Sequence, residues 1–461
     1  MHLAAASNIE GWLHILGPVP SAGEVSRVLD SELDTWRRNP KPATAFLNLL
    51  ARARLPSVAR EVLIFMRTGR VEVDLIHCNA VISAYEKGRC WQEALRLLWQ
   101  MPAMRVTPDE ISFNAAISAC EKAEQWQLAL VLLSRMPGLR VTPDQISYSA
   151  TISSCEKGAQ WQAALSLLFK MPTLRAEPNA ISCNAAISAC EKVGQLQVAL
   201  ELLGKMPELR LTPNEISYNA AISACEKLGQ VQLALGLLEQ MPTKRLRPDE
   251  ISYNAAISTC EKGCQWHVAL SLLRTMSEIG LKPDRISYNA AISALEKCGQ
   301  WKLALSLMSQ MAQNQLKPNE VTYSAAISAC EKFGQWVLVL ALLSEMPESM
   351  ALPNSIVFSA AVSACSKAGR WQGAVGLLSQ MLEMKVTPDD ISYGVVVTAC
   401  QKGSDGRQWA RALEFFAAMQ RQSLQPNVIA YEAALSACEQ SQNWSLALRL
   451  LSELCRYALY Q

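Results

Sequence analysis

The sequence lacks most of what an enzyme or a membrane protein needs. Only 4 of its 461 residues are histidine, and no catalytic constellation of acids, bases and nucleophiles stands out. No apolar run approaches the roughly 18 residues of a membrane-spanning helix; the longest, such as Val337–Leu343, are short helix faces. The net charge of +2 neither requires nor excludes nucleic acid, because a near-neutral total can hide a basic stripe. We predict a protein that is not an enzyme and is not inserted in a membrane.

Metal and cofactor ligands are equally scarce. Cys260, Cys264 and His267 resemble half of a zinc site, but a fourth ligand is not evident in the sequence. Structural zinc sites need four ligands, and Cys260 also belongs to a repeated series of cysteines. We therefore predict no metal and no cofactor.

The N-terminal segment shows no clear targeting signal. A secretory signal begins with positive charge followed by an apolar core, and transit peptides avoid acidic residues. Residues 1–39 lack the first pattern and contain several acids, among them Glu10, Glu24 and Asp30. We expect Val25–Arg38 to form a helix that caps one end of a repeat array, as terminal segments of stacked proteins must.

What the sequence has in abundance is internal repetition. The stretch Glu110–Asp144 is 35 residues long, and the following residues nearly repeat it. Full repeats begin at Leu75, Glu110, Gln145, Ala180, Glu215, Glu250, Arg285, Glu320 and Ser355. We predict a cap or non-repeat segment over 1–39, a degenerate repeat over 40–74, nine repeats over 75–389, a repeat with an insertion near Ser404–Gly406 over 390–427, and an incomplete repeat over 428–461. A fixed period of this length indicates a stacked architecture.

Each repeat predicts two helices. In Glu110–Asp144, Asp109 is placed to cap a first helix whose apolar face includes Ile111, Ala115, Ile117 and Cys120. A second helix starts near Trp126 and ends near Met136, where proline follows. One such pair cannot bury its apolar faces alone, so the pairs must stack.

Cysteine, tryptophan and methionine recur at the repeat spacing, and we interpret all three as residues that pack between repeats. The cysteines are too far apart for disulfides in stacked helices and serve as small buried fillers, which suggests a reducing compartment. They are Cys120, Cys155, Cys190, Cys225, Cys260, Cys330, Cys365, Cys400 and Cys438. The tryptophans, which invite an interpretation as base-stacking platforms, are better explained as inter-repeat core. They are Trp91, Trp126, Trp161, Trp266, Trp301, Trp336, Trp371, Trp409 and Trp444. The Met66, Met101 and Met136 series is interpreted in the same way.

The repeat resembles that of the pentatricopeptide repeat family. The features that carry the resemblance are Ile216–Asn219, Cys225–Lys227, Ala234–Leu238, Met241 and Pro248-Asp249, and they recur in order from Leu75 to about Glu453. The resemblance implies an all-α fold, a right-handed α-solenoid superhelix of stacked helix-turn-helix repeats of 35 residues, in a P-type array without a C-terminal catalytic domain. One departure is a proline directly after the helix methionine, from which we expect the second helix to end a turn early; it occurs at Pro102, Pro137, Pro172, Pro207, Pro242 and Pro347.

In this family the fifth and last residues of a repeat select one RNA base. The resemblance therefore implies these base-reading pairs: Asn79/Asp109, Asn114/Asp144, Ser149/Asn179, Asn184/Asn214, Asn219/Asp249, Asn254/Asp284, Asn289/Asn319, Ser324/Asn354 and Ser359/Asp389. Their order implies an RNA resembling UUACUUCAG. Thr44/Asp74 would add a G in front, and Gly394/Asn427 has no assigned base. An amide donates and accepts while a carboxylate only accepts, so such pairs can discriminate base edges. The alternative is that the last residues only cap helices.

Two further series accompany these pairs. The resemblance implies that the apolar second residue of each repeat sandwiches a base, with ordinary core as the alternative; the series is Ile76, Ile111, Ile146, Ile181, Ile216, Ile251, Ile286, Val321, Ile356 and Ile391. A lysine eight residues after the base-reading asparagine suits phosphates, with a solvated helix C-terminus as the alternative. The lysines are Lys87, Lys122, Lys157, Lys192, Lys227, Lys262, Lys297, Lys332, Lys367 and Lys402.

The predicted function is sequence-preferring binding of single-stranded RNA, about one base per repeat. By resemblance the protein would act in an organelle, chloroplast or mitochondrion, in RNA processing, stabilisation or translation, by occupancy or by recruiting a processing enzyme. The alternative is a helical-repeat scaffold that binds another protein.

Overall fold

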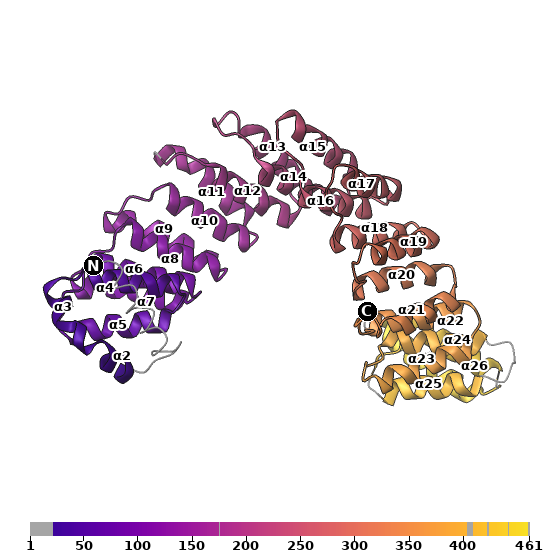
Figure 1. The fold of residues 1–461 in the computed structure, drawn as a ribbon. Coiled ribbons are helices and arrows are strands. Elements are labelled where there is room, and N and C mark those ends of the chain that lie inside the picture. The colour runs from indigo at the N-terminus through magenta and orange to yellow at the C-terminus, as the bar shows by residue number, and fades with distance from the viewer. Residues whose placement is uncertain (1–21, 175, 403–408, 422–423, 441, 460–461) are drawn as a thin grey trace. The chain divides into compact units, whose positions relative to one another are not determined.

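The fold is helical throughout the part of the chain that the structure describes. The computed structural model describes residues 22–174, 176–402, 409–421, 424–440 and 442–459. These residues form helices and connecting turns, without a strand among them (Figure 1). They belong to two compact units, Met1–Ala224 and Cys225–Gln461. Within each unit, successive helix pairs pack side by side, which confirms the predicted all-α solenoid. No described helix has both the length and the apolar character needed to cross a membrane.

The first helix of each pair, α4 excepted, begins directly after the last residue of the preceding repeat. These helices are α4 (Lys41–Arg52), α6 (Leu75–Lys87), α8 (Glu110–Lys122), α10 (Gln145–Lys157), α12 (Ala180–Val193), α14 (Glu215–Leu228), α16 (Glu250–Lys262), α18 (Arg285–Lys297), α20 (Glu320–Lys332), α22 (Ser355–Lys367), α24 (Asp390–Lys402) and α26 (Val428–Gln440). Each of them other than α14 packs on its own second helix and on at least one neighbouring first helix, as α10 packs on α8, α11 and α12. The first helices therefore form a continuous layer within each unit.

The second helices differ in length, and proline is the reason. They are α5 (Pro56–Thr68), α7 (Trp91–Gln100), α9 (Trp126–Arg135), α11 (Trp161–Lys170), α13 (Leu196–Lys205), α15 (Val231–Thr243), α17 (Trp266–Glu278), α19 (Trp301–Gln313), α21 (Trp336–Glu345), α23 (Trp371–Glu383), α25 (Trp409–Arg421) and α27 (Trp444–Leu459). Where proline follows the methionine, α7, α9, α11, α13 and α21 stop after 10 residues, whereas α17, α19 and α23 reach 13.

The early stop predicted from proline is confirmed in those five helices and wrong at Pro242. Short 3₁₀ turns follow three of the shortened helices, η2 (Pro102–Met104), η3 (Pro137–Leu139) and η4 (Met171–Leu174). Pro242 instead lies inside α15. Beyond it the backbone resumes the α pattern, since the Lys244 N–H donates to the Gln240 carbonyl at 3.2 Å.

The N-terminal segment is not the single helix predicted over Val25–Arg38. It forms α2 (Ala22–Leu29), a 3₁₀ turn η1 (Asp30–Glu32) and α3 (Leu33–Arg38). The break buries both ends of the segment, because α2 packs on α5 through the fully buried Val25 and Leu29, while Trp36 of α3 is also buried. The insertion predicted near Ser404–Gly406 lies outside the described residues.

The core consists of the small and flexible apolar residues that recur along the sequence. The nine repeated cysteines are all buried, as predicted, and burial raises the pKa of the Cys120 thiol to about 11. Met66, Met101 and Met136 are fully buried too. Ile111 was placed on the core face of the first helix, and this is wrong, because its side chain is 62% exposed.

The repeated tryptophans contact neighbouring repeats, but they are only half-buried. A Cβ placed on Gly158 would collide with the Trp126 ring, so this ring lies against the turn of the next repeat. Arg370 lies over the Trp336 ring at 5.0 Å, again from the following repeat. Trp444 is 63% exposed. The inter-repeat interpretation is therefore confirmed for Trp126 and Trp336, at the edge of the core rather than in its centre.

The glycines in the turns between helices allow a first prediction about stability. Gly229 has φ +61°, and an added Cβ would lie 3.0 Å from the backbone of Lys262 and Gly263. We expect Gly229→Ala to lower the free energy of unfolding by about 1–3 kcal/mol, from backbone strain and the close approach together. Chemical denaturation of the full chain measures this value.

Two other glycines separate these two causes. Gly280 has φ +83° with open space around it, so Gly280→Ala should show the strain alone, about 1 kcal/mol. Gly236 lies inside α15, also in open space, and Gly236→Ala should stabilise by roughly 0.5–1 kcal/mol because alanine is the better helix former. Equal losses from Gly229→Ala and Gly280→Ala would show that the close approach has no cost.

Candidate nucleic-acid interface

One stripe of the first helix is only partly covered by protein in α8, whereas in α10 and α12 the fifth residues of the stripe, Ser149 and Asn184, are buried. In α8 the buried side chains are Ser112, Phe113, Ala115, Ala116, Ile117, Ala119 and Cys120. Between them, Ile111 is exposed and Asn114, Ser118 and Lys122 are half-buried. Residues spaced by three, four and four lie on one face of a helix. The second, fifth and thirteenth residues of the repeat, predicted to sandwich, read and neutralise RNA, thus share one open stripe.

The last residue of each repeat reaches this stripe as the N-cap of the next first helix. Asp109 has an extended backbone, with φ −110° and ψ −175°, and its Oδ1 accepts the Ser112 backbone N–H at 2.9 Å. The Asp144 Oδ1 accepts from the Ser147 N–H in the same way at 2.8 Å. The last residue of the repeat therefore caps the next first helix, as the alternative interpretation proposed. The cap uses one of the two carboxylate oxygens.

The fifth and last residues lie in direct contact. The Asn114 Nδ2 donates to Asp144 Oδ1 at 3.1 Å, although 30 residues separate the two in sequence. Four other pairs make the same bond, at 3.1 to 3.2 Å: Asn79–Asp109, Asn184–Asn214, Asn254–Asp284 and Asn289–Asn319. The contact brings a side-chain amide and a second amide or carboxylate to one point per repeat.

Each such pair retains groups for a ligand. Among the described residues, Asp109, Asp144 and Asp284 use Oδ1 in all their hydrogen bonds to Asn and Ser side chains and cap N–H groups. The other carboxylate oxygen, an acceptor, is left for a partner from outside. The asparagine Nδ2 likewise carries a second hydrogen, since one of its two serves the aspartate. The pair thus offers one acceptor beside one donor.

Pairs with serine at the fifth position are looser. Ser149 reaches Asn179 at 3.4 Å and Ser359 reaches Asp389 at 3.3 Å. Within the described residues, no hydrogen bond joins Ser324 to Asn354, whose Oδ1 accepts only the Val357 N–H. The serine side chain is one bond shorter than that of asparagine, which accounts for the longer distances. Asn219 and Asp249 belong to different compact units.

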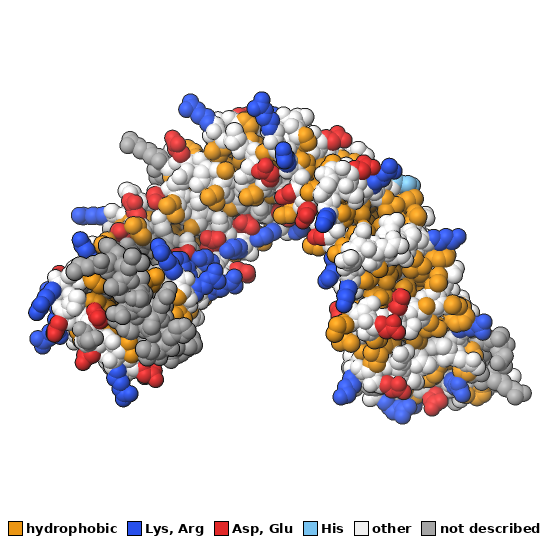
Figure 2. All heavy atoms as spheres, in the orientation of Figure 1, with side chains coloured by type: hydrophobic (Ala, Val, Ile, Leu, Met, Phe, Trp, Pro, Cys, Tyr) orange, Lys and Arg blue, Asp and Glu red, His pale blue; other side chains and the backbone are white. Residues whose placement is uncertain are grey.

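The apolar second residues are exposed in every full repeat. Their exposed fractions range from 53% at Ile391 to 65% at Ile181, with Ile76, Ile111, Ile146, Ile216, Ile251, Ile286, Val321 and Ile356 between them. Apolar side chains reach the visible surface of both units (Figure 2). Ordinary core, the alternative for this series, is therefore wrong. Isolated surface leucines or isoleucines need no explanation, but a row at one position per repeat does.

The lysine series is engaged in ion pairs between successive repeats. Six lysines contact the glutamate 36 residues earlier, at 2.7 to 3.1 Å: Lys122–Glu86, Lys157–Glu121, Lys192–Glu156, Lys297–Glu261, Lys332–Glu296 and Lys367–Glu331. We call these pairs the lysine–glutamate ladder. The lysines are still 34–47% exposed. The side chain of Lys402 lies outside the described residues.

Glu226 holds the equivalent position in a repeat outside the ladder, and this position is partly desolvated. Burial raises the pKa of the Glu226 carboxyl, and the nearby Lys262 opposes this effect. The hydrogen bond to Glu261 raises the pKa of Lys297. Lys87 precedes the ladder, since its matching position one repeat earlier is Ala51. The lysines are thus less free for phosphates than the sequence suggested.

Family models match most of the repeat region. Models described as PPR repeat family match 213–262 and 283–332, a pentatricopeptide repeat domain matches 166–227, a pentatricopeptide repeat-containing protein matches 43–114, and single PPR repeats match 111–141, 321–349 and 356–386. The chain belongs to the pentatricopeptide repeat family. Together these matches span well over half of the sequence. No curated protein matches it.

Several solved structures are similar to this pentatricopeptide repeat protein. The pentatricopeptide repeat protein PPR10 from maize is 18% identical, covers 95% of this chain and 82% of its own, and has a TM-score of 0.41. PPR10 in complex with an 18-nt psaJ RNA element is 20% identical, with coverage of 99% and 82% and a TM-score of 0.41. Yeast Rmd9p in complex with a 16-nt target RNA is 9% identical, with coverage of 97% on both sides and a TM-score of 0.36.

Two residues of the pentatricopeptide repeat were missed by sequence reasoning. Ser118, the ninth residue, lies on the open stripe between Asn114 and Lys122. Ser112, the third residue, is fully buried and bonds to the base-reading pair of the repeat before it. The signal for Ser112 was available, since a hydroxyl three residues after an N-cap aspartate is the reverse of the familiar capping box.

Proposed function

We propose that this chain binds single-stranded RNA with sequence preference, about one base per repeat. The observation that carries the proposal is the open stripe, where an exposed apolar residue stands beside an Asn/Asp or Asn/Asn pair in repeat after repeat. The apolar row suits the faces of bases, and the polar pair suits their edges. Neither row alone would support the proposal as well as their combination.

The chemistry of the pairs matches pyrimidine edges. A uracil presents the N3–H donor beside carbonyl acceptors, which an aspartate acceptor and an asparagine N–H complement. With asparagine as the last residue, as in Asn184/Asn214, the pair can also donate to the unprotonated N3 of cytosine. The bases of the three pairs with serine rest on the family resemblance alone, and with them we propose UUACUUCAG as the target and the nine pairs from Asn79/Asp109 to Ser359/Asp389 as readers.

The proposed role is binding rather than catalysis. An RNA held along the open stripe would be protected from nucleases, kept unfolded or presented to a recruited processing enzyme. We place this activity in an organelle, chloroplast or mitochondrion, in RNA processing, stabilisation or translation. A fluorescent fusion of the full chain that stays outside both organelles would contradict this location.

The decisive experiment compares two RNAs. UUACUUCAG and a scrambled RNA of the same composition are titrated with the full chain in about 150 mM salt. We expect the designed sequence to bind more tightly. Equal binding of both would reject sequence preference. Binding of neither, together with capture of a protein ligand by the same stripe, would favour a helical-repeat scaffold.

The lysine–glutamate ladder gives a separate prediction about phosphates. Lys332 bonds to the Glu296 carboxylate and carbonyl, both at 2.9 Å. We expect Lys332→Gln to weaken the binding of the designed and the scrambled RNA by the same factor. It should also reduce the slope of log affinity against log salt concentration by about 1. We expect stability to change by less than about 1 kcal/mol, because both side chains are partly exposed.

The matched variant is Glu296→Gln, which removes the charge that holds Lys332. It should strengthen RNA binding, since Lys332 then has no carboxylate partner at Glu296 and is available to a phosphate. If Lys332→Gln and Glu296→Gln both leave RNA binding unchanged, the lysines serve only to join repeats.

A further inference from the structure

A buried hydroxyl links each base-reading pair to the next repeat. Ser147, the third residue of α10, is fully buried. Its Oγ lies 2.5 Å from Asn114 Oδ1 and 2.8 Å from Asp144 Oδ1, and it accepts the Asp144 backbone N–H at 3.2 Å. Because Ser147 is buried, its hydroxyl contacts both members of the pair on the side that faces the protein interior, away from the open stripe.

The geometry fixes which way the asparagine amide points. A serine hydroxyl carries one proton, and the contact of 2.5 Å between Ser147 Oγ and Asn114 Oδ1 is the shorter of its two acceptor contacts. With Oδ1 held by Ser147, the Asn114 Nδ2 is turned to Asp144, where it donates at 3.1 Å. The opposite amide orientation would place Nδ2 against Ser147 and oxygen against the carboxylate.

The same arrangement recurs wherever asparagine is the fifth residue within one compact unit. The hydroxyl-to-Oδ1 distances are 2.5 to 2.6 Å for Ser112–Asn79, Ser217–Asn184, Ser287–Asn254 and Thr322–Asn289. The hydroxyl residues are all fully buried. Thr322 shows that threonine serves as well as serine.

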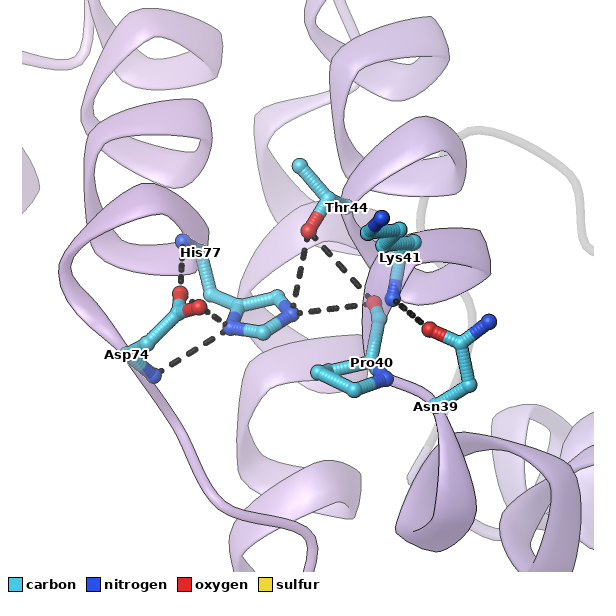
Figure 3. A network of polar contacts seen from close by, with 6 residues as sticks. All are labelled: Asn39, Pro40, Lys41, Thr44, Asp74 and His77. Carbon is cyan, nitrogen blue, oxygen red and sulfur yellow. Dashed lines mark hydrogen bonds and ion pairs between the residues drawn. The ribbon is translucent and has the colours of Figure 1, made fainter.

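Three positions depart from the pattern, and in each of them the fifth residue is threonine or serine. In the first full repeat His77 is the third residue, and its Nε2 lies 3.2 Å from Thr44 Oγ1 of the degenerate repeat while its Nδ1 contacts Asp74 (Figure 3). In α12 the Ser182 hydroxyl donates to the Asn179 carbonyl at 2.9 Å, and among the described residues no hydrogen bond joins it to Ser149. In α22 the third residue is Val357, and the hydroxyl link to Ser324 is missing among the described residues.

We propose that the third residue of the following repeat is a specificity-positioning residue for each base that a pair with asparagine at the fifth position reads. Held in one orientation, the amide presents N–H to the base beside the free aspartate oxygen, a donor and an acceptor. Without the hydroxyl, the amide can turn over and present oxygen instead. A base whose edge presents the opposite pattern of donors and acceptors is then accepted. The discrimination between bases therefore falls more than the affinity for RNA.

The inference rests on the proposed function, and one experiment separates the two. The full chain, Ser147→Ala and Ser147→Thr are titrated with UUACUUCAG, with the scrambled RNA, and with UCACUUCAG, which changes the base assigned to Asn114/Asp144. We expect the full chain to prefer U at this base, Ser147→Ala to lose about tenfold of that preference, and Ser147→Thr to retain it. Preferences at the other bases should not change.

The outcomes are distinct. If the unchanged chain does not distinguish UUACUUCAG from the scramble, the proposed function fails. If it does, but Ser147→Ala keeps its full preference for U over C, the positioning role fails. A loss of thermal stability that weakens all RNAs equally would assign Ser147 a structural role only and would also overturn the inference.

Discussion

Replacing Ile111, Ile146 and Ile181 together with alanine is expected to weaken RNA binding by about 100-fold. Each side chain would lose its contact with the faces of bases, worth roughly 1 kcal/mol at the lower end of base-stacking energies. Three separate contacts add, and about 3 kcal/mol corresponds to slightly more than 100-fold in affinity. Fluorescence anisotropy with labelled UUACUUCAG measures the change.

The same triple variant should not lower thermal stability. The three side chains are 62%, 60% and 65% exposed, so little buried apolar area is lost, and alanine is the better helix former. Val131, Leu233 and Leu303 provide the matched control, because they are also partly exposed aliphatic residues but lie on second helices. Their replacement by alanine should leave RNA binding intact. A comparable loss of affinity in both triple variants would place RNA elsewhere than the open stripe.

The exposure of these isoleucines could not be derived from the sequence alone. An isoleucine spaced four residues from Ala115 on an amphipathic helix is normally core, and Ile111 was assigned to that face. The core of α8 instead centres on Phe113, Ala116 and Cys120, whereas Ile111 lies in the first turn of the helix and is exposed. Only the family resemblance indicated a surface role.

Contacts within one repeat were easier to foresee than contacts between repeats. The helix pair, its N-cap aspartate and its buried cysteine follow from periodicity and local chemistry. The pairing of Lys332 with Glu296 depends on the offset between the first helices of neighbouring repeats. This offset places the lysine beside the residue that precedes its own equivalent in the repeat before. No pattern within α20 encodes that offset. The same holds for Ser147, whose partner Asn114 lies 33 residues away.

Proline shows a limit of local rules. The same Met-Pro pair ends α9 at Arg135 and lies inside α15 at Pro242. The residues after proline differ, with Gly138 in one repeat and Thr243 in the other. The threonine does not account for the longer helix, because Thr243 and Thr173 donate their hydroxyls to the Gln240 and Lys170 carbonyls alike, both at 2.6 Å, although α11 ends at Lys170.

Exchanging Asp109 and Asp144 together for asparagine is expected to change the preferred first two bases from UU to CC. The aspartate oxygen left for the base only accepts, and matches the uracil N3–H, whereas an amide can donate to cytosine N3. Each pair that becomes complementary to cytosine instead of uracil is worth about 1–3 kcal/mol of discrimination. The preference at each of the two bases should therefore change by roughly tenfold or more. Titration with UUACUUCAG and CCACUUCAG measures the reversal.

The exchange is designed so that folding is unaffected. Asparagine already caps several first helices in this chain; for example, Asn179 accepts the Ser182 N–H at 2.7 Å and Asn319 accepts the Thr322 N–H at 3.1 Å. Asp109→Ala and Asp144→Ala form the contrasting pair. They remove the cap, cost about 1 kcal/mol each in stability, and should weaken both RNAs without a reversal. If the asparagine variant still prefers UU, the last residue of the repeat is a cap and not a reader, and the row of bases would have to be selected by the fifth residue alone.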